Sequence, residues 1–87
     1  MLDPEWVYFR IPPSEMTFVT RIIEGYEYLG VVTALDGKTG MGFVRTTVDT
    51  AVMTKNILQS LPFPVTLITY EDALQHKKKM NPSLAKR

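Results

Sequence analysis

The chain has 87 residues, of which 45% are hydrophobic and 22% charged, and its formal net charge is +1. These values are typical of one small globular domain, and a domain of this size buries only about 60% of the surface that its unfolded chain exposes. The absence of cysteine excludes disulfides, CxxC metal sites and thiol chemistry. Because no run of about 18 apolar residues occurs either, we expect a cytoplasmic protein with no membrane partner.

Charge is distributed unevenly along the chain. Residues 1–70 carry five basic and seven acidic side chains, whereas residues 71–87 carry five basic and two acidic ones. We therefore expect a single domain at 1–70 and a basic C-terminal extension at 71–87 that forms a short helix and then a disordered tail. Such an extension can contact nucleic acid or anionic lipid, although most basic ends are simply solvated. Its basic residues are Lys77, Lys78, Lys79, Lys86 and Arg87.

Hydrophobic periodicity predicts six elements in the order strand, helix, strand, strand, helix, strand. The helices follow from apolar residues at three- and four-residue spacing, the first capped by Ser14 and ended by Gly25, the second capped by Thr47 or Asp49. A turn at 36–40 joins the two middle strands into a hairpin. The predicted strands are 6–11, 28–35, 41–46 and 65–70, and the predicted helices are 15–25 and 48–61.

This order indicates an α+β fold of the ferredoxin-like βαββαβ type, a four-stranded antiparallel sheet with two helices on one face. In the first strand, alternation places Val7, Phe9 and Ile11 on the helix-covered face. Trp6, Tyr8 and Arg10 then lie on the opposite face, which this pattern leaves open. An open face must be covered or must carry groups for a partner.

No catalytic, cofactor or metal site is predicted. Gly37-Lys38-Thr39 resembles the end of a phosphate-binding loop, but Val32 stands where that motif needs its first glycine, and a strand follows instead of a helix. His76 lies beside three lysines with no predicted partner to make it a general base. The carboxylates are scattered, with no spacing typical of an acid–base pair or of metal ligands.

Single-stranded RNA binding is an alternative reading of the open face. RNA-recognition motifs carry basic–Gly–aromatic–Gly–Phe–Val in their third strand, and residues 40–46 match this pattern at Gly40, Gly42, Phe43 and Val44. Tyr8 and Phe43 would then stack on bases while Arg10 and Arg45 meet phosphates. Met41 replaces one stacking aromatic, and the acidic body lacks the basic footprint of a nucleic-acid binder. Alternatively, Phe43 faces the helices.

Residues 7–68 resemble a small bacterial family known as a domain of unknown function. The resemblance is carried by the first strand and its proline at 7–12, the helix end at 22–26, the strand at 29–33 and the helix end at 57–61. It implies a ferredoxin-like domain of the bacterial cytosol and supplies no catalytic residues.

The sequence therefore favours a non-enzymatic protein-association domain that self-associates through the open sheet face, most simply as a dimer. RNA binding on that face, and small-ligand sensing at a subunit interface, remain as alternatives. The predicted interaction face consists of Trp6, Tyr8, Arg10, Phe43 and Arg45.

Overall fold

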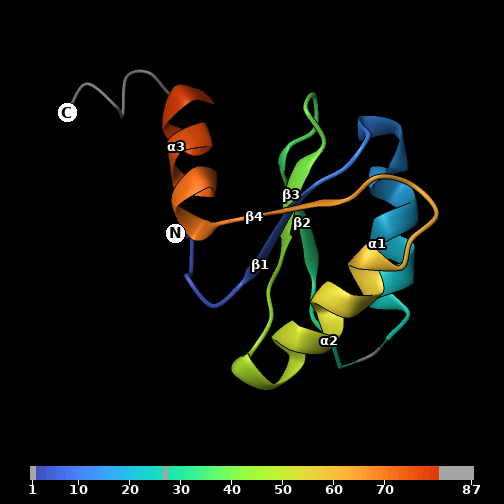
Figure 1. Cartoon of the computed structure of the whole chain (residues 1–87). Coiled ribbons are helices and arrows are strands. Elements are labelled where there is room, and N and C mark those ends of the chain that lie inside the picture. The colour runs from blue at the N-terminus through green and yellow to red at the C-terminus, as the bar shows by residue number, and fades with distance from the viewer. Residues whose placement is uncertain (1, 27, 81–87) are drawn as a thin grey trace.

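The structure, a computed structural model, describes residues 2–26 and 28–80 (Figure 1). One antiparallel sheet with the spatial order β2-β3-β1-β4 lies at its centre. Its strands are β1 (Val7–Arg10), β2 (Val32–Asp36), β3 (Met41–Val44) and β4 (Thr66–Ile68), and its helices are α1 (Met16–Glu24), α2 (Val48–Gln59) and α3 (Tyr70–Met80). The predicted α+β class and the four-stranded antiparallel sheet are confirmed.

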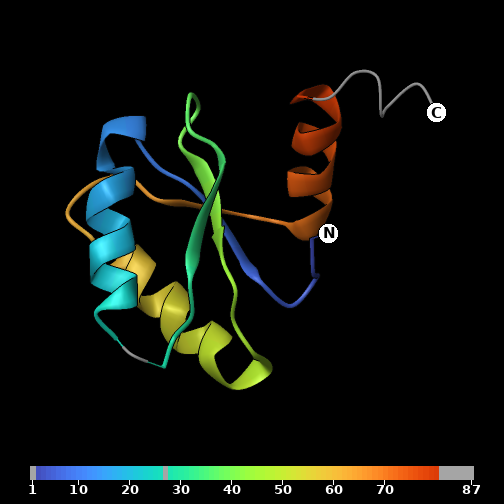
Figure 2. The ribbon, with the colours of Figure 1, turned by 180° about the vertical axis from the view of Figure 1, so that it is seen from behind.

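Helices α1 and α2 lie together on one side of the sheet, and α3 lies on the other side (Figures 1 and 2). The main core fills the space under α1 and α2, where burial of apolar side chains supplies most of the stabilisation. Its fully buried members are Val7, Phe9, Ile11, Val19, Ile23, Leu29, Val44 and Leu58.

Alternation along β1 follows the prediction. Val7 and Phe9 belong to the main core, whereas Tyr8 packs with Trp6 on the other face. Phe43 also lies on the Tyr8 face, which decides between the two alternatives for that residue. The reason is its neighbour: Gly42 faces the main core beneath the Phe9 ring, and a Cβ there would lie 3.0 Å from Phe9 Cζ. Gly42 in β3 thus leaves space for the Phe9 ring of β1, and the next residue, Phe43, points to the opposite face.

The predicted second strand starts too early. Residues before Val32 form a turn, in which the Leu29 amide donates to the Tyr26 carbonyl and Gly30 adopts a φ of +142°. A side chain at Gly30 would place its Cβ 2.2 Å from the Arg45 carbonyl oxygen. The apolar run at 28–35 therefore has two roles. Leu29 in its first half is buried in the main core, and only the second half, from Val32, pairs with β3.

The helix starts agree with the sequence in one case of two. Ser14 does not cap α1, because Pro13–Glu15 form a 3₁₀ turn and α1 begins after Glu15. Thr47 does cap α2, with its backbone N–H donating to Thr50 Oγ1 at 3.0 Å.

The largest difference concerns the face predicted to be open. From residue 70 the chain forms α3, and the Thr69 hydroxyl accepts the Asp72 amide at its start. Ala73 is fully buried, and Tyr70 and Leu74 pack against the cluster that contains Tyr8 and Phe43. The sequence signal was an apolar i, i+3, i+4 pattern at these three residues, with acids in the first turn and lysines in the last, as the helix dipole favours.

The tight turn before β3 gives a direct test of this backbone. Gly40 has a φ of +77°, and a Cβ there would lie 1.8 Å from the Ile11 carbonyl oxygen. We expect Gly40→Ala to lower the free energy of unfolding by about 2–3 kcal/mol in urea denaturation. Gly37→Ala in the same turn is the control, because nothing lies within 4 Å of the added methyl group. Equal stability of the two variants would contradict the described turn.

Candidate functional site

Trp6, Phe43 and Arg45 form a stack on the α3 side of the sheet. The Trp6 and Phe43 rings lie parallel with their centroids 5.0 Å apart, and the Arg45 guanidinium carbon lies 5.3 Å from the Trp6 ring. Such stacking and cation–π contacts each stabilise by about 1 kcal/mol. Trp6 remains half-buried and Arg45 exposed, so only the rim of the predicted interaction face reaches solvent.

Tyr8 lies at the centre of that face and is closed to solvent, with 2% of its surface exposed. Its hydroxyl donates to the Asp3 carbonyl oxygen at 2.6 Å, and its ring tilts against Phe43 and Tyr70. Burial raises the pKa of Tyr8 to about 12, which outweighs the opposing effect of the hydrogen bond with the Asp3 backbone. The phenol is therefore a neutral structural donor.

The predicted open interaction face is thus corrected. Tyr8 and Phe43 are 2% and 4% exposed, because α3 and Leu2 cover them. Bases can stack only on accessible rings, and the Tyr8 and Phe43 rings are not accessible in this arrangement. Sequence reasoning placed these residues on the correct face and predicted a short helix in the C-terminal extension, but it did not predict that this helix covers the face.

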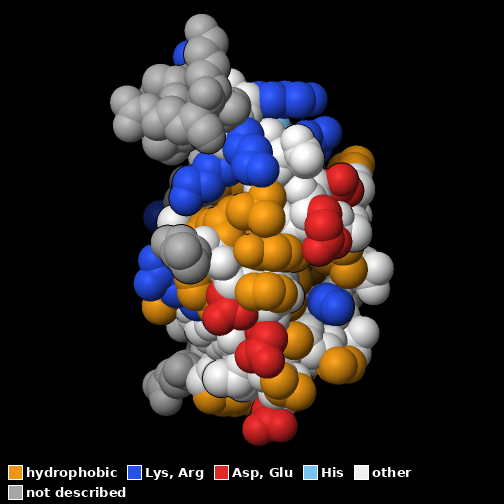
Figure 3. Space-filling view, turned by 90° about the vertical axis from the view of Figure 1, so that its left-hand side faces the viewer, with side chains coloured by type: hydrophobic (Ala, Val, Ile, Leu, Met, Phe, Trp, Pro, Cys, Tyr) orange, Lys and Arg blue, Asp and Glu red, His pale blue; other side chains and the backbone are white. Residues whose placement is uncertain are grey.

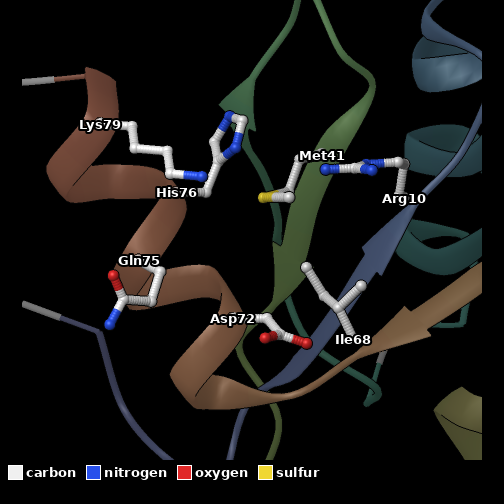
Figure 4. A pocket seen from close by; sticks show the side chains of 7 residues that line it. All are labelled: Arg10, Met41, Ile68, Asp72, Gln75, His76 and Lys79. Carbon is white, nitrogen blue, oxygen red and sulfur yellow. The ribbon is translucent and has the colours of Figure 1, made fainter.

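Arg10, the remaining strand residue of the predicted face, leads to a different site. It lines a groove of about 280 Å³ between the sheet and α3. The buried Met41 and the half-buried Ile68 form the sheet side, and the Arg10 side chain points toward Met41, in the direction of α3 (Figure 4). The complete lining is Arg10, Met41, Ile68, Asp72, Gln75, His76 and Lys79.

His76 borders the groove and is held by an acidic turn residue. Its Nε2 lies 2.7 Å from Asp36 Oδ2, and both side chains are largely shielded from solvent. The Lys38 amide donates to the other oxygen of the same carboxylate at 3.0 Å. The hydrogen bond with His76 is the main reason that the pKa of Asp36 lies below its usual value. The pair ties α3 to the β2–β3 hairpin across 40 residues of sequence.

The Gly37-Lys38-Thr39 segment is part of the turn between β2 and β3, as predicted. The basic cluster occupies the last turn of α3, with Lys77 half-buried and Lys78 and Lys79 exposed. Figure 3 shows the side of the molecule on which α3 lies. Lys and Arg side chains gather there near the C-terminal end of α3, while acidic side chains lie lower, among hydrophobic ones. Lys86 and Arg87 lie outside the described residues, as does the rest of the predicted 71–87 extension after residue 80, so the predicted tail is not described.

A third feature lies on the outer side of α2, where apolar residues face solvent. Val48 and Val52, one helical turn apart, are 67% and 66% exposed, and Met53 is 44% exposed. Tyr28, 63% exposed, directs its hydroxyl to Met53 Sδ at 3.4 Å. On the inner side of the same helix Thr54 is fully buried and donates to the Thr50 carbonyl oxygen at 2.8 Å. Sequence reasoning missed this surface, which its i, i+4 valines signal. We call Tyr28, Val48, Val52 and Met53 the α2 patch.

Within residues 2–26 and 28–80, no helix is both long and apolar enough to cross a bilayer. In the same ranges, no three side chains of His, Cys, Asp or Glu are grouped so that they could hold a metal ion.

The comparison with known families agrees with the resemblance drawn from the sequence. Residues 9–65 match the family described as Domain of unknown function (DUF4911), so the chain belongs to that family. The match ends before β4 and does not include α3. No curated protein and no solved structure matches the chain.

The Tyr8 phenol makes stability depend on alkaline pH in a defined direction. Its pKa is about 12 in the fold against 10.0 ordinarily, so the stabilisation is complete below pH 10 and is lost as the pH rises through 12. Between about pH 9.5 and 11.5 we expect the wild type to lose roughly 1–2 kcal/mol more unfolding free energy than Tyr8→Phe, measured by urea denaturation.

Tyr26→Phe is the control for this measurement, because Tyr26 is 41% exposed and does not belong to the α2 patch. It should keep the wild-type pH dependence. If Tyr8→Phe follows the wild-type curve over the same range, then Tyr8 ionises freely in the fold and its burial is wrong.

Proposed function

We propose that this protein is a non-enzymatic association domain that forms a homodimer through the α2 patch. We further propose that it is a ferredoxin-like domain extended by α3. The element order from β1 to β4, with α1 and α2 on one side of the sheet, supports the fold assignment. The absence of cysteine supports a reducing compartment such as the cytoplasm.

The observation that carries the proposal is the exposure of apolar side chains on α2. This helix buries a threonine completely while two valines are about two-thirds exposed. Isolated exposed apolar residues are ordinary, but contiguous ones on a monomer mark a binding surface. Here Val48 and Val52 lie one turn apart on α2, and Tyr28 of the α1–β2 turn contacts Met53 of the same helix.

A second copy of the chain suits this surface better than an unrelated partner. A two-fold axis beside Val52 would pair two α2 helices in antiparallel orientation, so that each Val52 meets its counterpart. Asp49 and Lys55 are exposed and lie three residues on either side of Val52. Asp49 of one copy therefore comes level with Lys55 of the other, twice in the dimer. The face is thus complementary to itself in charge as well as in apolar character.

The groove and the hairpin favour a non-enzymatic role. The groove lining contains no hydroxyl or thiol nucleophile. His76, the only histidine of the chain, already directs Nε2 to Asp36. With Nε2 on Asp36, only Nδ1 of His76 is left to act as a general base, and the groove lining offers no hydroxyl or thiol that it could activate.

Replacing the central valine tests the dimer. We expect the wild type to sediment as a dimer at tens of micromolar and Val52→Asp as a monomer, with the dimer dissociation constant raised at least tenfold, since two carboxylates would meet at the axis. Because Val52 is exposed in the monomer, the melting temperature of Val52→Asp should differ from that of the wild type by only a few degrees. Thr17→Asp on the exposed side of α1 adds the same charge and should remain dimeric.

A charge exchange on α2 then tests whether the two helices pair in antiparallel orientation. Asp49→Lys and Lys55→Asp should each weaken the dimer about threefold to tenfold, and the double exchange should bring it back to within about threefold of the wild type. A monomeric wild type at these concentrations would overturn the proposal. A dimer that Val52→Asp leaves intact would also overturn it.

A further inference from the structure

We propose that the groove between α3 and the sheet binds a small organic carboxylate with an apolar body. This site is separate from the α2 patch, because α3 and α2 lie on opposite sides of the sheet (Figures 1 and 2). It therefore does not depend on dimerisation. The argument rests on the shape of the groove, on its unpaired cations and on its charge balance.

The groove has an apolar floor and polar walls. Met41, 2% exposed, and Ile68 lie on the sheet, while α3 supplies Asp72, Gln75, His76 and Lys79 from successive turns (Figure 4). Its volume of about 280 Å³ lies just below the range for drug-sized ligands, roughly 300–1,000 Å³, and therefore suits a smaller molecule. A short aliphatic or aromatic body fits such a floor, and its polar end must then meet the walls.

Two cations from different elements border the floor. Arg10 extends from the end of β1, and Lys79 projects from the last turn of α3 toward His76 (Figure 4). Among the residues that the structure describes, neither cation forms a salt bridge, since the one ion pair there joins His76 to Asp36. A guanidinium offers a planar fork that matches a carboxylate through two parallel hydrogen bonds.

The other titratable groups of the groove select for a single negative charge. His76 and Asp36 satisfy each other, which leaves Arg10, Lys79 and the Asp72 carboxylate as the charges that face the groove. Their sum is one positive charge. A monoanion neutralises it, whereas a phosphate dianion would be repelled by Asp72. An ammonium group beside the carboxylate of the ligand would find Asp72 as its partner, as in an amino acid.

The test is a titration of the full chain with hexanoate, followed in ¹H–¹⁵N NMR spectra. We expect a dissociation constant of about 1 mM, with shifts concentrated at Met41, Ile68 and the α3 residues of the groove. Hexanamide, of the same shape but uncharged, and inorganic phosphate should each bind at least about fivefold more weakly. Norleucine, which adds an ammonium group to hexanoate, distinguishes an amino acid from a simple acid as the preferred ligand.

Matched variants assign the charges. Arg10→Gln should weaken hexanoate binding about tenfold and Lys79→Gln about threefold, whereas Asp72→Asn should strengthen it. Lys78→Gln is the control, because Lys78 precedes Lys79 on α3 and does not line the groove. Arg10 and Lys79 are exposed, so both variants should keep the wild-type melting temperature and fold.

Three results would overturn the inference. The first is the absence of shifts at the groove with both hexanoate and norleucine up to about 20 mM, some twentyfold above the expected dissociation constant. The second is binding of hexanamide as tight as that of hexanoate, and the third is an equal effect of Lys78→Gln and Lys79→Gln. Loss of dimerisation in Val52→Asp should leave hexanoate binding unchanged, so the failure of one proposal is separable from the failure of the other.

Discussion

Burial of apolar side chains on both faces of the central strands is the constraint on which the rest of this structure depends. In β1, Val7 and Phe9 face one side and Tyr8 the other, and all three are almost completely buried. β3 repeats this arrangement with Val44 and Phe43 on opposite sides. A sheet with two apolar faces must be covered twice, because exposed rings lose the free energy that burial supplies. Helices α1 and α2 cover one face, and α3 covers the other.

The two proposed sites follow from how these covers are built. Helix α3 has few apolar residues, so it shields the Tyr8 face with Tyr70, Ala73 and Leu74 and leaves a polar-walled groove beside them. The His76–Asp36 pair holds this helix to the hairpin beside that groove. Helix α2, in contrast, carries more apolar surface than the core takes up. The apolar side chains that the core does not bury lie on the outer side of α2, where the α2 patch is available to a second copy.

Much of the fold could be predicted from local patterns, and less of the candidate sites. Period-two alternation in β1 placed Tyr8 and Trp6 on the face away from α1 and α2, and the turn residues located the β2–β3 hairpin. Alternation says which residues share a face but not what covers it, so the interaction face was wrongly expected to be open. Arg10 was placed on the correct face, but only α3 brings Lys79 and His76 to it. The α2 patch was missed because valines at helical spacing are equally typical of a core.

By itself, the sequence determined the α+β class, the order of the elements up to β4 and the absence of cysteine chemistry, because these depend on residue type and short-range spacing. Only the tertiary structure decided that α3 folds back on the sheet, that Phe43 shares a face with Tyr8, and that His76 meets Asp36. These contacts join Tyr8 to Tyr70, Tyr8 to Phe43, and Asp36 to His76, which are 62, 35 and 40 positions apart and come together as a result of packing. Gly42 illustrates the physical reason. A glycine is needed there because the Phe9 ring of the neighbouring strand lies against it, and only the pairing of β1 with β3 brings that ring to this position.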